Sequence, residues 1–176
     1  MIDLLLIFKE SGISLLGYNL TENRNLNEKN EEELVTGFFS VLFQYFSTQF
    51  GQIQSIRTEK KMILIKKIES VYVSLVITLL ENPTDSRFEK VWFLNNRIEE
   101  MAIRLIKSIE RILVPYLKKI EKKKESSTIE IPLDQQIQKN LILITKNSRN
   151  KMTNLKDMIG PNSKKTNELK RIYQNV

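Results

Sequence analysis

The chain has 176 residues, a formal net charge of +7 at pH 7, and neither cysteine nor histidine. This composition excludes disulfides and thiolate nucleophiles, and it removes most zinc sites and the commonest general base of enzymes. None of the five glycines stands close enough to another to form a phosphate-binding loop, so we predict a protein that is not an enzyme and uses no cofactor or metal.

The first predicted element is a β-hairpin over residues 2–19. Two apolar runs, IDLLLIF and ISLLGYN, flank the connector KESG, whose glycine suits a tight turn. Apolar residues occupy the consecutive positions 4–8, which is typical of a strand covered on both faces. We therefore expect this strand to lie at the centre of a sheet with helices on each side.

The sequence also predicts a cytoplasmic protein. The opening strand lacks a basic segment and a signal-peptide cleavage pattern. No apolar run reaches the roughly 18 residues needed to cross a bilayer.

A helix is predicted over residues 31–50. Asn30 and Glu33 form a capping-box pattern at its start, and Gly51 marks its end. No charged residue occurs from Leu34 to Phe50. One apolar stripe consists of Leu34, Phe38, Val41, Leu42 and Tyr45. A second stripe widens it to about half of the helix circumference and is the candidate partner interface: Val35, Phe39, Phe43, Phe46 and Phe50.

Two interpretations of this wide apolar surface remain open. It can form a loose, phenylalanine-rich core, or it can form a second contact surface for a partner or for the C-terminal part of the same chain. On the remaining side, Gly37, Ser40 and Ser47 would let another helix approach closely.

Three further strands are predicted over residues 51–58, 62–67 and 71–80, since these segments are rich in β-branched residues and spaced like a meander. A long amphipathic helix follows over residues 88–120, with a capping-box pattern at Ser86 and Glu89. We expect Trp92 to lie in the core. Pro115 predicts a kink or break over residues 111–114, because proline lacks the N–H that the helix requires.

The basic excess lies in the last third of the chain. Residues 1–117 hold 14 Lys and Arg against 15 Asp and Glu, whereas residues 118–176 hold 14 against 6. A candidate basic patch opens this region: Lys118, Lys119, Lys122, Lys123 and Lys124. Such a run is usually a solvated face. The alternative is a region that binds nucleic acid or an anionic membrane surface, and nucleic acid is disfavoured because the run lacks aromatic residues and arginine.

The C-terminal part predicts a separate extension. Residues 125–133 read as a linker, Asp134 suits the start of a helix over residues 134–159, and Gly160 with Pro161 ends it. The last segment, 164–176, has marginal helical character. We therefore predict a domain over residues 1–124 and a basic helical extension over 134–176, with residues 1–120 able to fold alone.

The predicted fold class is α/β of the α+β type, with a five-stranded antiparallel sheet between helices in the order β-β-α-β-β-β-α. This order resembles the longin branch of the SNARE-like, or roadblock/longin, superfamily. The resemblance covers residues 1–120 and rests on LLIFKESGISLLGYN, EEELVTGFFSVLFQYF and SIRTEKKMILIKKIESVYVSLVIT.

The resemblance implies a non-enzymatic protein-interaction module. Similar domains bind small GTPases or a sister longin or roadblock subunit, act in vesicle trafficking or GTPase regulation, and often form dimers. The family has no shared catalytic or cofactor residues to transfer. Because Gly160 and Pro161 would interrupt a long coiled coil, a SNARE role is disfavoured. Peripheral membrane contact through the lysines is a further expectation.

Overall fold

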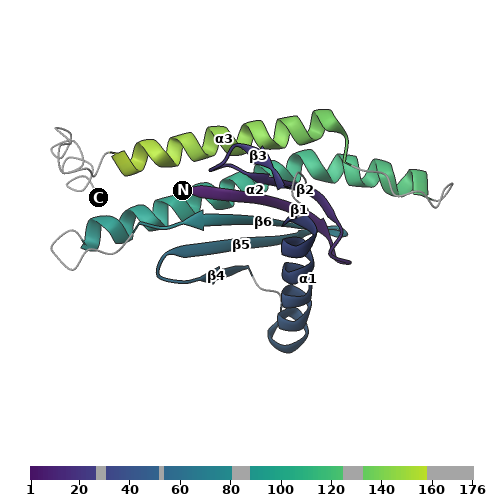
Figure 1. Cartoon of the computed structure of the whole chain (residues 1–176), viewed down its shortest axis with the longest axis horizontal. Helices are drawn as coiled ribbons and strands as arrows, with labels where there is room; N and C mark the ends of the chain where they lie inside the picture. The colour runs from purple at the N-terminus through teal and green to yellow at the C-terminus, as the bar shows by residue number, and fades with distance from the viewer. Residues whose placement is uncertain (27–30, 52–53, 81–87, 125–132, 158–176) are drawn as a thin grey trace.

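The computed structural model describes residues 1–26, 31–51, 54–80, 88–124 and 133–157. Along the chain (Figure 1), its elements are β1 (Ile2–Lys9), β2 (Ser14–Asn19), β3 (Arg24–Asn25), α1 (Glu31–Phe50), β4 (Ser55–Arg57), β5 (Lys61–Ile68), β6 (Val71–Thr78), α2 (Phe88–Lys124) and α3 (Gln135–Asp157). The mixed α/β class is as predicted.

All six strands form one antiparallel sheet in the order β3-β2-β1-β6-β5-β4. The prediction of five strands missed β3, whose two residues are too few to show any alternation of apolar and polar side chains. The predicted hairpin and meander are confirmed, and β1 lies between β2 and β6 at the centre of the sheet.

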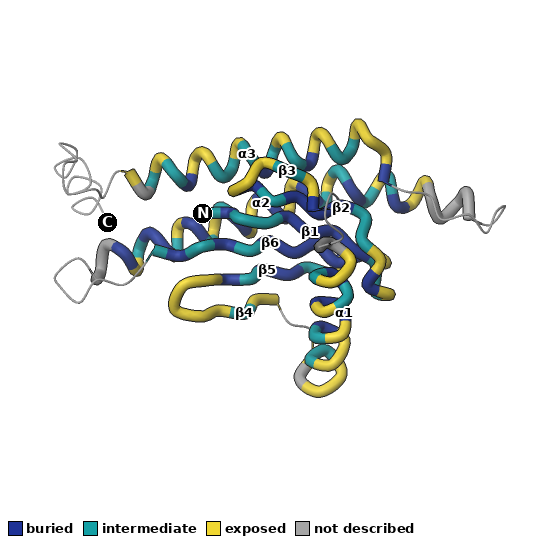
Figure 2. The backbone as a smooth tube through the Cα atoms, in the orientation of Figure 1, coloured by how far each residue is buried: buried dark blue, intermediate teal, exposed yellow. Residues whose placement is uncertain are grey.

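The central strand is covered on both faces, as its continuous apolar run predicted. Leu5 and Ile7 belong to one core, which the sheet shares with α2 and α3. Leu6 and Phe8 belong to a second core, which the sheet shares with α1. Figure 2 shows β1, β5 and β6 as largely buried, with the exposed residues gathered on the outer sides of the helices and at the turns.

α2 runs as one continuous helix through Pro115, so of the predicted kink or break the break is absent. Its N-terminal part is held to the end of β6 by Asn95, whose side chain binds both the N–H and the carbonyl of Leu80 at 2.9 and 3.1 Å. Trp92 is 56% exposed, so the expectation that it lies in the core is wrong. Val91 and Leu94, on either side of it, turn towards the core instead.

α3 begins as predicted at Asp134, whose carboxylate accepts the N–H of Gln136 at 2.8 Å. It lies beside α2 on the same face of the sheet (Figure 1). Leu141 and Met152 are fully buried in the core shared with α2. The Arg149 side chain contacts the end of β2, where it donates a hydrogen bond to the carbonyl of Leu20 at 2.7 Å.

Residues beyond 120 contribute to the core on this face of the sheet. Leu133, Leu141 and Met152 lie in the same buried cluster as α2, and the folding of residues 1–120 without them stays a prediction. α3 also lies on the face opposite α1, so it does not cover α1.

Several predicted features lie outside the described residues. They are the capping residues Asn30 and Ser86, most of the linker, the helix end at Gly160 and Pro161, and the segment 164–176.

Candidate protein-interaction surface

The orientation of α1 is set by polar side chains on one side of the helix. Thr36 Oγ1 donates to the carbonyl of Gly12 at 2.9 Å, and both Ser40 and Gln44 donate to the carbonyl of Glu10. These carbonyls belong to the turn between β1 and β2, where they would otherwise lack partners. Thr36 and Ser40 are buried as a result, so the polar side of α1 faces inwards.

Glycine at the turn allows this close approach. Gly12 has a φ of +87°, which strongly favours glycine, and a Cβ there would lie 3.2 Å from the Cα of Gly37. The Cα of Gly37 therefore packs against the chain's own hairpin, while a Cβ on Gly37 would meet no atom within 4 Å.

Two rings of the candidate interface are buried inside the molecule. Phe43 is 1% exposed and stacks on Phe39, with ring centroids 5.4 Å apart. Phe43 also contacts Phe8 and Tyr72 of the sheet, at 6.1 and 5.8 Å. The assignment of Phe39 and Phe43 to a partner interface is thereby corrected, because the hydrogen bonds to the turn rotate these rings onto the sheet.

The other members of that stripe are placed differently. Val35 packs at the margin of the α1 core, and Phe46 is half-buried beside Tyr45. The side chain of Phe50 lies outside what the structure describes. The stripe therefore forms no continuous outer surface over its described members.

The apolar surface that α1 does present to solvent lies on the opposite side. It consists of four side chains spaced four, three and four residues apart: Leu34 (79% exposed), Phe38 (64%), Val41 (70%) and Tyr45 (61%). We call this set the outer α1 face. Residues at this spacing form one stripe along a helix.

Sequence reasoning found this stripe but assigned the candidate partner interface to the other one. Both stripes are apolar, so hydrophobicity alone cannot decide which one faces the sheet. The deciding contacts join α1 to backbone carbonyls about 25–30 residues earlier in the chain. The one local signal is the spacing of Thr36, Ser40 and Gln44, which aligns three polar side chains for a single partner.

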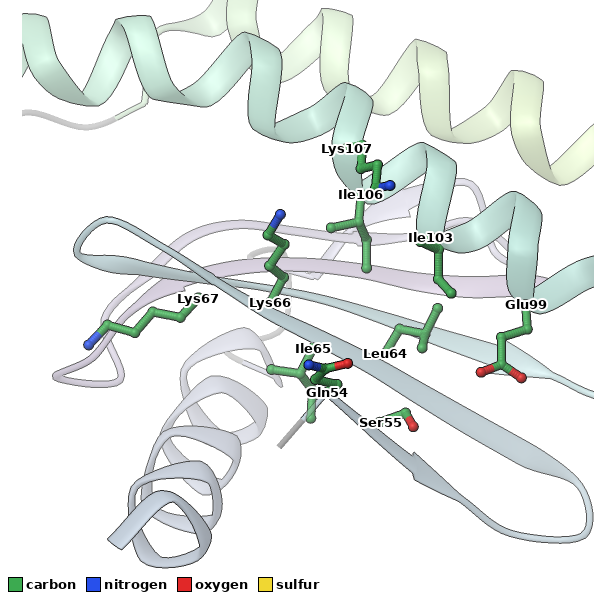
Figure 3. Close-up of a pocket in the computed structure, with 10 residues that line it drawn as sticks. All are labelled: Gln54, Ser55, Leu64, Ile65, Lys66, Lys67, Glu99, Ile103, Ile106 and Lys107. Carbon is green, nitrogen blue, oxygen red and sulfur yellow. The ribbon is translucent and has the colours of Figure 1, made fainter. Parts of the chain in front are cut away.

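A separate cavity of about 370 Å³ lies between α2 and the edge of the sheet formed by β4 and β5. Figure 3 shows Ile103 and Ile106 of α2 above Leu64 of β5, with the side chains of Lys66 and Lys107 on the α2 side. Leu64 and Ile106 are buried, while Ile103 is 41% exposed.

The charged groups around the cavity are mostly bound to one another. Lys66 Nζ lies 2.6 Å from a carboxylate oxygen of Glu110, and Arg57 binds Glu99 at 3.5 Å. Lys67 points away from α2 in Figure 3 and pairs with Glu10. The hydrogen bond that Lys67 donates to the Glu10 carboxylate raises the pKa of Lys67 above its usual value. These ion pairs tie β4 and β5 to their neighbours.

The candidate basic patch falls at the end of α2. Lys118 and Lys119 are exposed there. Lys122, Lys123 and Lys124 form the last turn of the same helix, and their side chains lie outside what the structure describes.

Among the described residues, no group of three or more His, Cys, Asp or Glu could hold a metal ion. No described helix is both long enough and apolar enough to span a membrane.

No family model and no curated protein matches this chain. Among solved structures, it is similar to the Roadblock/LC7 domain from Streptomyces avermitilis, with 7% sequence identity and a TM-score of 0.34. The match covers 44% of this chain and 66% of that domain, which is less than two thirds of its length. The fold and the surfaces described above therefore rest on the geometry of this chain.

Proposed function

We propose that this protein is a non-enzymatic interaction module that binds a protein partner through the outer α1 face. The observation that carries the proposal is a stripe of four large apolar side chains, each more than 60% exposed, on a helix segment without any charge. Single exposed apolar residues are common on protein surfaces and have no special meaning. A contiguous group of them, such as this stripe, is typical of an interaction site.

The stripe is also held in a fixed orientation. The hydrogen bonds of Thr36 and Ser40 and the burial of Phe43 prevent the helix from rotating its outer face onto the sheet. A preformed face loses less conformational entropy on binding than a flexible one.

The energetics favour a partner that covers more than this stripe. Fully burying a Leu, Val or Phe side chain is worth about 1.5–3 kcal/mol, so the four residues supply several kcal/mol. Association itself costs about 4–15 kcal/mol, and stable interfaces bury about 800 Å² on each partner. The outer α1 face is therefore the centre of an interface whose rim includes neighbouring parts of the molecule.

The spacing indicates the kind of partner. Side chains at i, i+4, i+7 and i+11 fit the groove between two helices, or a single apolar helix. Following the resemblance to longin domains, we propose that the partner is a small GTPase or a longin or roadblock subunit, a second copy of this chain included. The cellular role would then be GTPase regulation or vesicle trafficking.

The test is a double substitution, Phe38→Glu with Val41→Glu. Both side chains are exposed, so the free energy of unfolding should change little, while two carboxylates in the middle of the interface should abolish binding. The readouts are the molecular mass by light scattering over a range of concentrations, and co-purification with candidate partners.

The matched control is Leu143→Glu, which places a charge on an exposed apolar residue of α3. It should leave mass and co-purification unchanged. The proposal fails if the double variant keeps every association of the unmodified chain, or if Leu143→Glu abolishes the same associations.

A further inference from the structure

The outer side of α2 is strongly cationic over its second half. Between Ile103 and Lys119, the exposed charged residues are all positive: Arg104, Lys107, Arg111, Lys118 and Lys119. The single carboxylate in this stretch, Glu110, is half-buried and bound to Lys66. We call these five residues the α2 ridge.

Most of the ridge forms a single line. Arg104, Lys107, Arg111 and Lys118 follow one another at spacings of three, four and seven residues, which keeps them on one side of the helix. The line is about 21 Å long at 1.5 Å per residue. It points away from the core, because Leu105, Ile109 and Leu113, on the opposite side of the helix, are buried.

The neighbouring helix α3 is also rich in cations, but the structure engages two of them in contacts. Lys146 lies over the ring of Tyr18, and Arg149 donates to the carbonyl of Leu20. Lys139 and Lys151 are exposed and stand twelve residues apart, so among the described side chains the closely spaced line of exposed cations lies on α2.

An anionic membrane surface suits the α2 ridge better than nucleic acid does. The exposed residues from 103 to 119 include no aromatic side chain on which a base could stack. A lipid surface suits such a line of cations, because its diffuse charge requires no exact spacing of partners.

We infer that the α2 ridge binds the surface of an anionic membrane, with the helix axis parallel to it. α1 and α2 cover opposite faces of the sheet (Figure 1), so a chain bound in this way presents the outer α1 face away from the lipid. Each lysine or arginine near an anionic surface raises the partition coefficient about five-fold. The inference goes beyond the proposed function and does not depend on it.

The experiment is sedimentation of the full chain with vesicles of phosphatidylcholine, with and without phosphatidylserine. We expect binding only when phosphatidylserine is present, and a loss of binding as salt screens the charges. Lys107→Gln with Lys118→Gln should lower the partition coefficient about 25-fold, at five-fold per charge. Lys107→Arg with Lys118→Arg should restore it.

The matched control is Lys60→Gln with Lys67→Gln, which removes two exposed lysines from β5 and the turn before it. It should bind vesicles like the unmodified chain, and so should Phe38→Glu with Val41→Glu. The inference is overturned if phosphatidylserine does not promote binding, or if the two glutamine variants lose binding equally. Tighter binding to duplex DNA or RNA than to vesicles, at equal phosphate concentration and salt, also overturns it.

Discussion

The two faces of the sheet are covered by helices of different character. On one face, α1 alone packs a small core that is rich in aromatic rings, among them Phe8, Phe39, Phe43 and Tyr72. On the other face, α2 and α3 together pack a larger core that is mainly aliphatic. The two faces also differ outwards, since α1 shows apolar side chains to solvent and α2 shows cations.

This difference separates stability from recognition. The free energy of folding grows with the apolar area that is buried, so the α2–α3 face should supply most of it. α1 buries less and is positioned largely by hydrogen bonds to the β1–β2 turn. Its remaining apolar surface, the outer α1 face, is exposed, and it is the surface for which we propose a partner. The inward side of α1 combines Phe39 and Phe43 with the buried Thr36 and Ser40, whereas that of α2 is mainly aliphatic. The two helices also differ on the sides that face solvent.

The largest expected effect comes from the α2–α3 face. Leu141→Ala with Met152→Ala removes two fully buried side chains, each worth about 2–5 kcal/mol. The sum approaches the whole stability of a typical domain, about 5–15 kcal/mol, so the variant should be partly or fully unfolded. Urea denaturation followed by circular dichroism measures this.

The control for that variant is Leu143→Ala, whose side chain is 57% exposed and should matter little. An unchanged urea midpoint in the double variant would show that α3 does not stabilise the domain, and the distinction between the two faces would fail.

The next effect compares two phenylalanines of the same helix. Phe43→Ala should lower the free energy of unfolding by about 3–5 kcal/mol, because the ring is buried against the sheet. Phe38→Ala should change it by about 0.5 kcal/mol or less, because that ring is 64% exposed. Equal losses for the two variants would mean that the outer α1 face is itself part of a core.

A smaller effect tests how α1 is oriented. Thr36→Val keeps the shape of the side chain but leaves the buried carbonyl of Gly12 without this donor, at a cost of about 1–3 kcal/mol. Thr48→Val is the control, since the hydroxyl of Thr48 is exposed and bonds only within its own helix, to the carbonyl of Gln44. If both variants unfold at the same urea concentration, the tether to the turn does not orient α1.

The smallest effect is a dependence on pH through the ion pair of Lys67 and Glu10, which joins β5 to the turn that holds α1. The hydrogen bond with Glu10 raises the pKa of Lys67 in the folded chain above 10.5. The pair therefore stabilises the fold fully below that unfolded value, and the contribution is lost as the pH rises through the folded pKa. Both side chains are exposed, so solvent weakens the effect.

The measurement for this pair is the urea midpoint from neutral pH up to the alkaline range. Lys67→Met should remove the part of the alkaline decline that comes from this pair. A decline of the same size in both proteins would assign it to other groups.

Local patterns predicted much of the fold. The hairpin, the end of α1 at Gly51 and the start of α3 at Asp134 all depend on residues within a few positions of one another. Such turns and helix caps can be recognised in the sequence because the residues that stabilise them are only a few positions apart along the backbone.

Features that depend on distant contacts could not be predicted in the same way. The side of α1 that faces the sheet is decided by carbonyls of the β1–β2 turn, and the exposure of Trp92 is decided by how α2 settles on the sheet. The place of α3 depends on Leu141 and Met152 meeting a core whose other members are up to 150 residues away. In the α2 ridge, Arg104, Lys107 and Arg111 were missed because they are separated in sequence and come together only as one side of a helix.

The order of strands in the sheet has a consequence for how the chain folds. β1 and β2 form one local hairpin, β5 and β6 form another, and the two join only where β1 meets β6, as in the pairing of Lys9 with Val71. The chain between β1 and β6 forms a long loop, and closing it costs little more free energy than closing a shorter one. This loop must nevertheless close before the β1–β6 contacts at the centre of the sheet can form. The hairpins can therefore form within microseconds, whereas the pairing of β1 with β6 sets the folding rate.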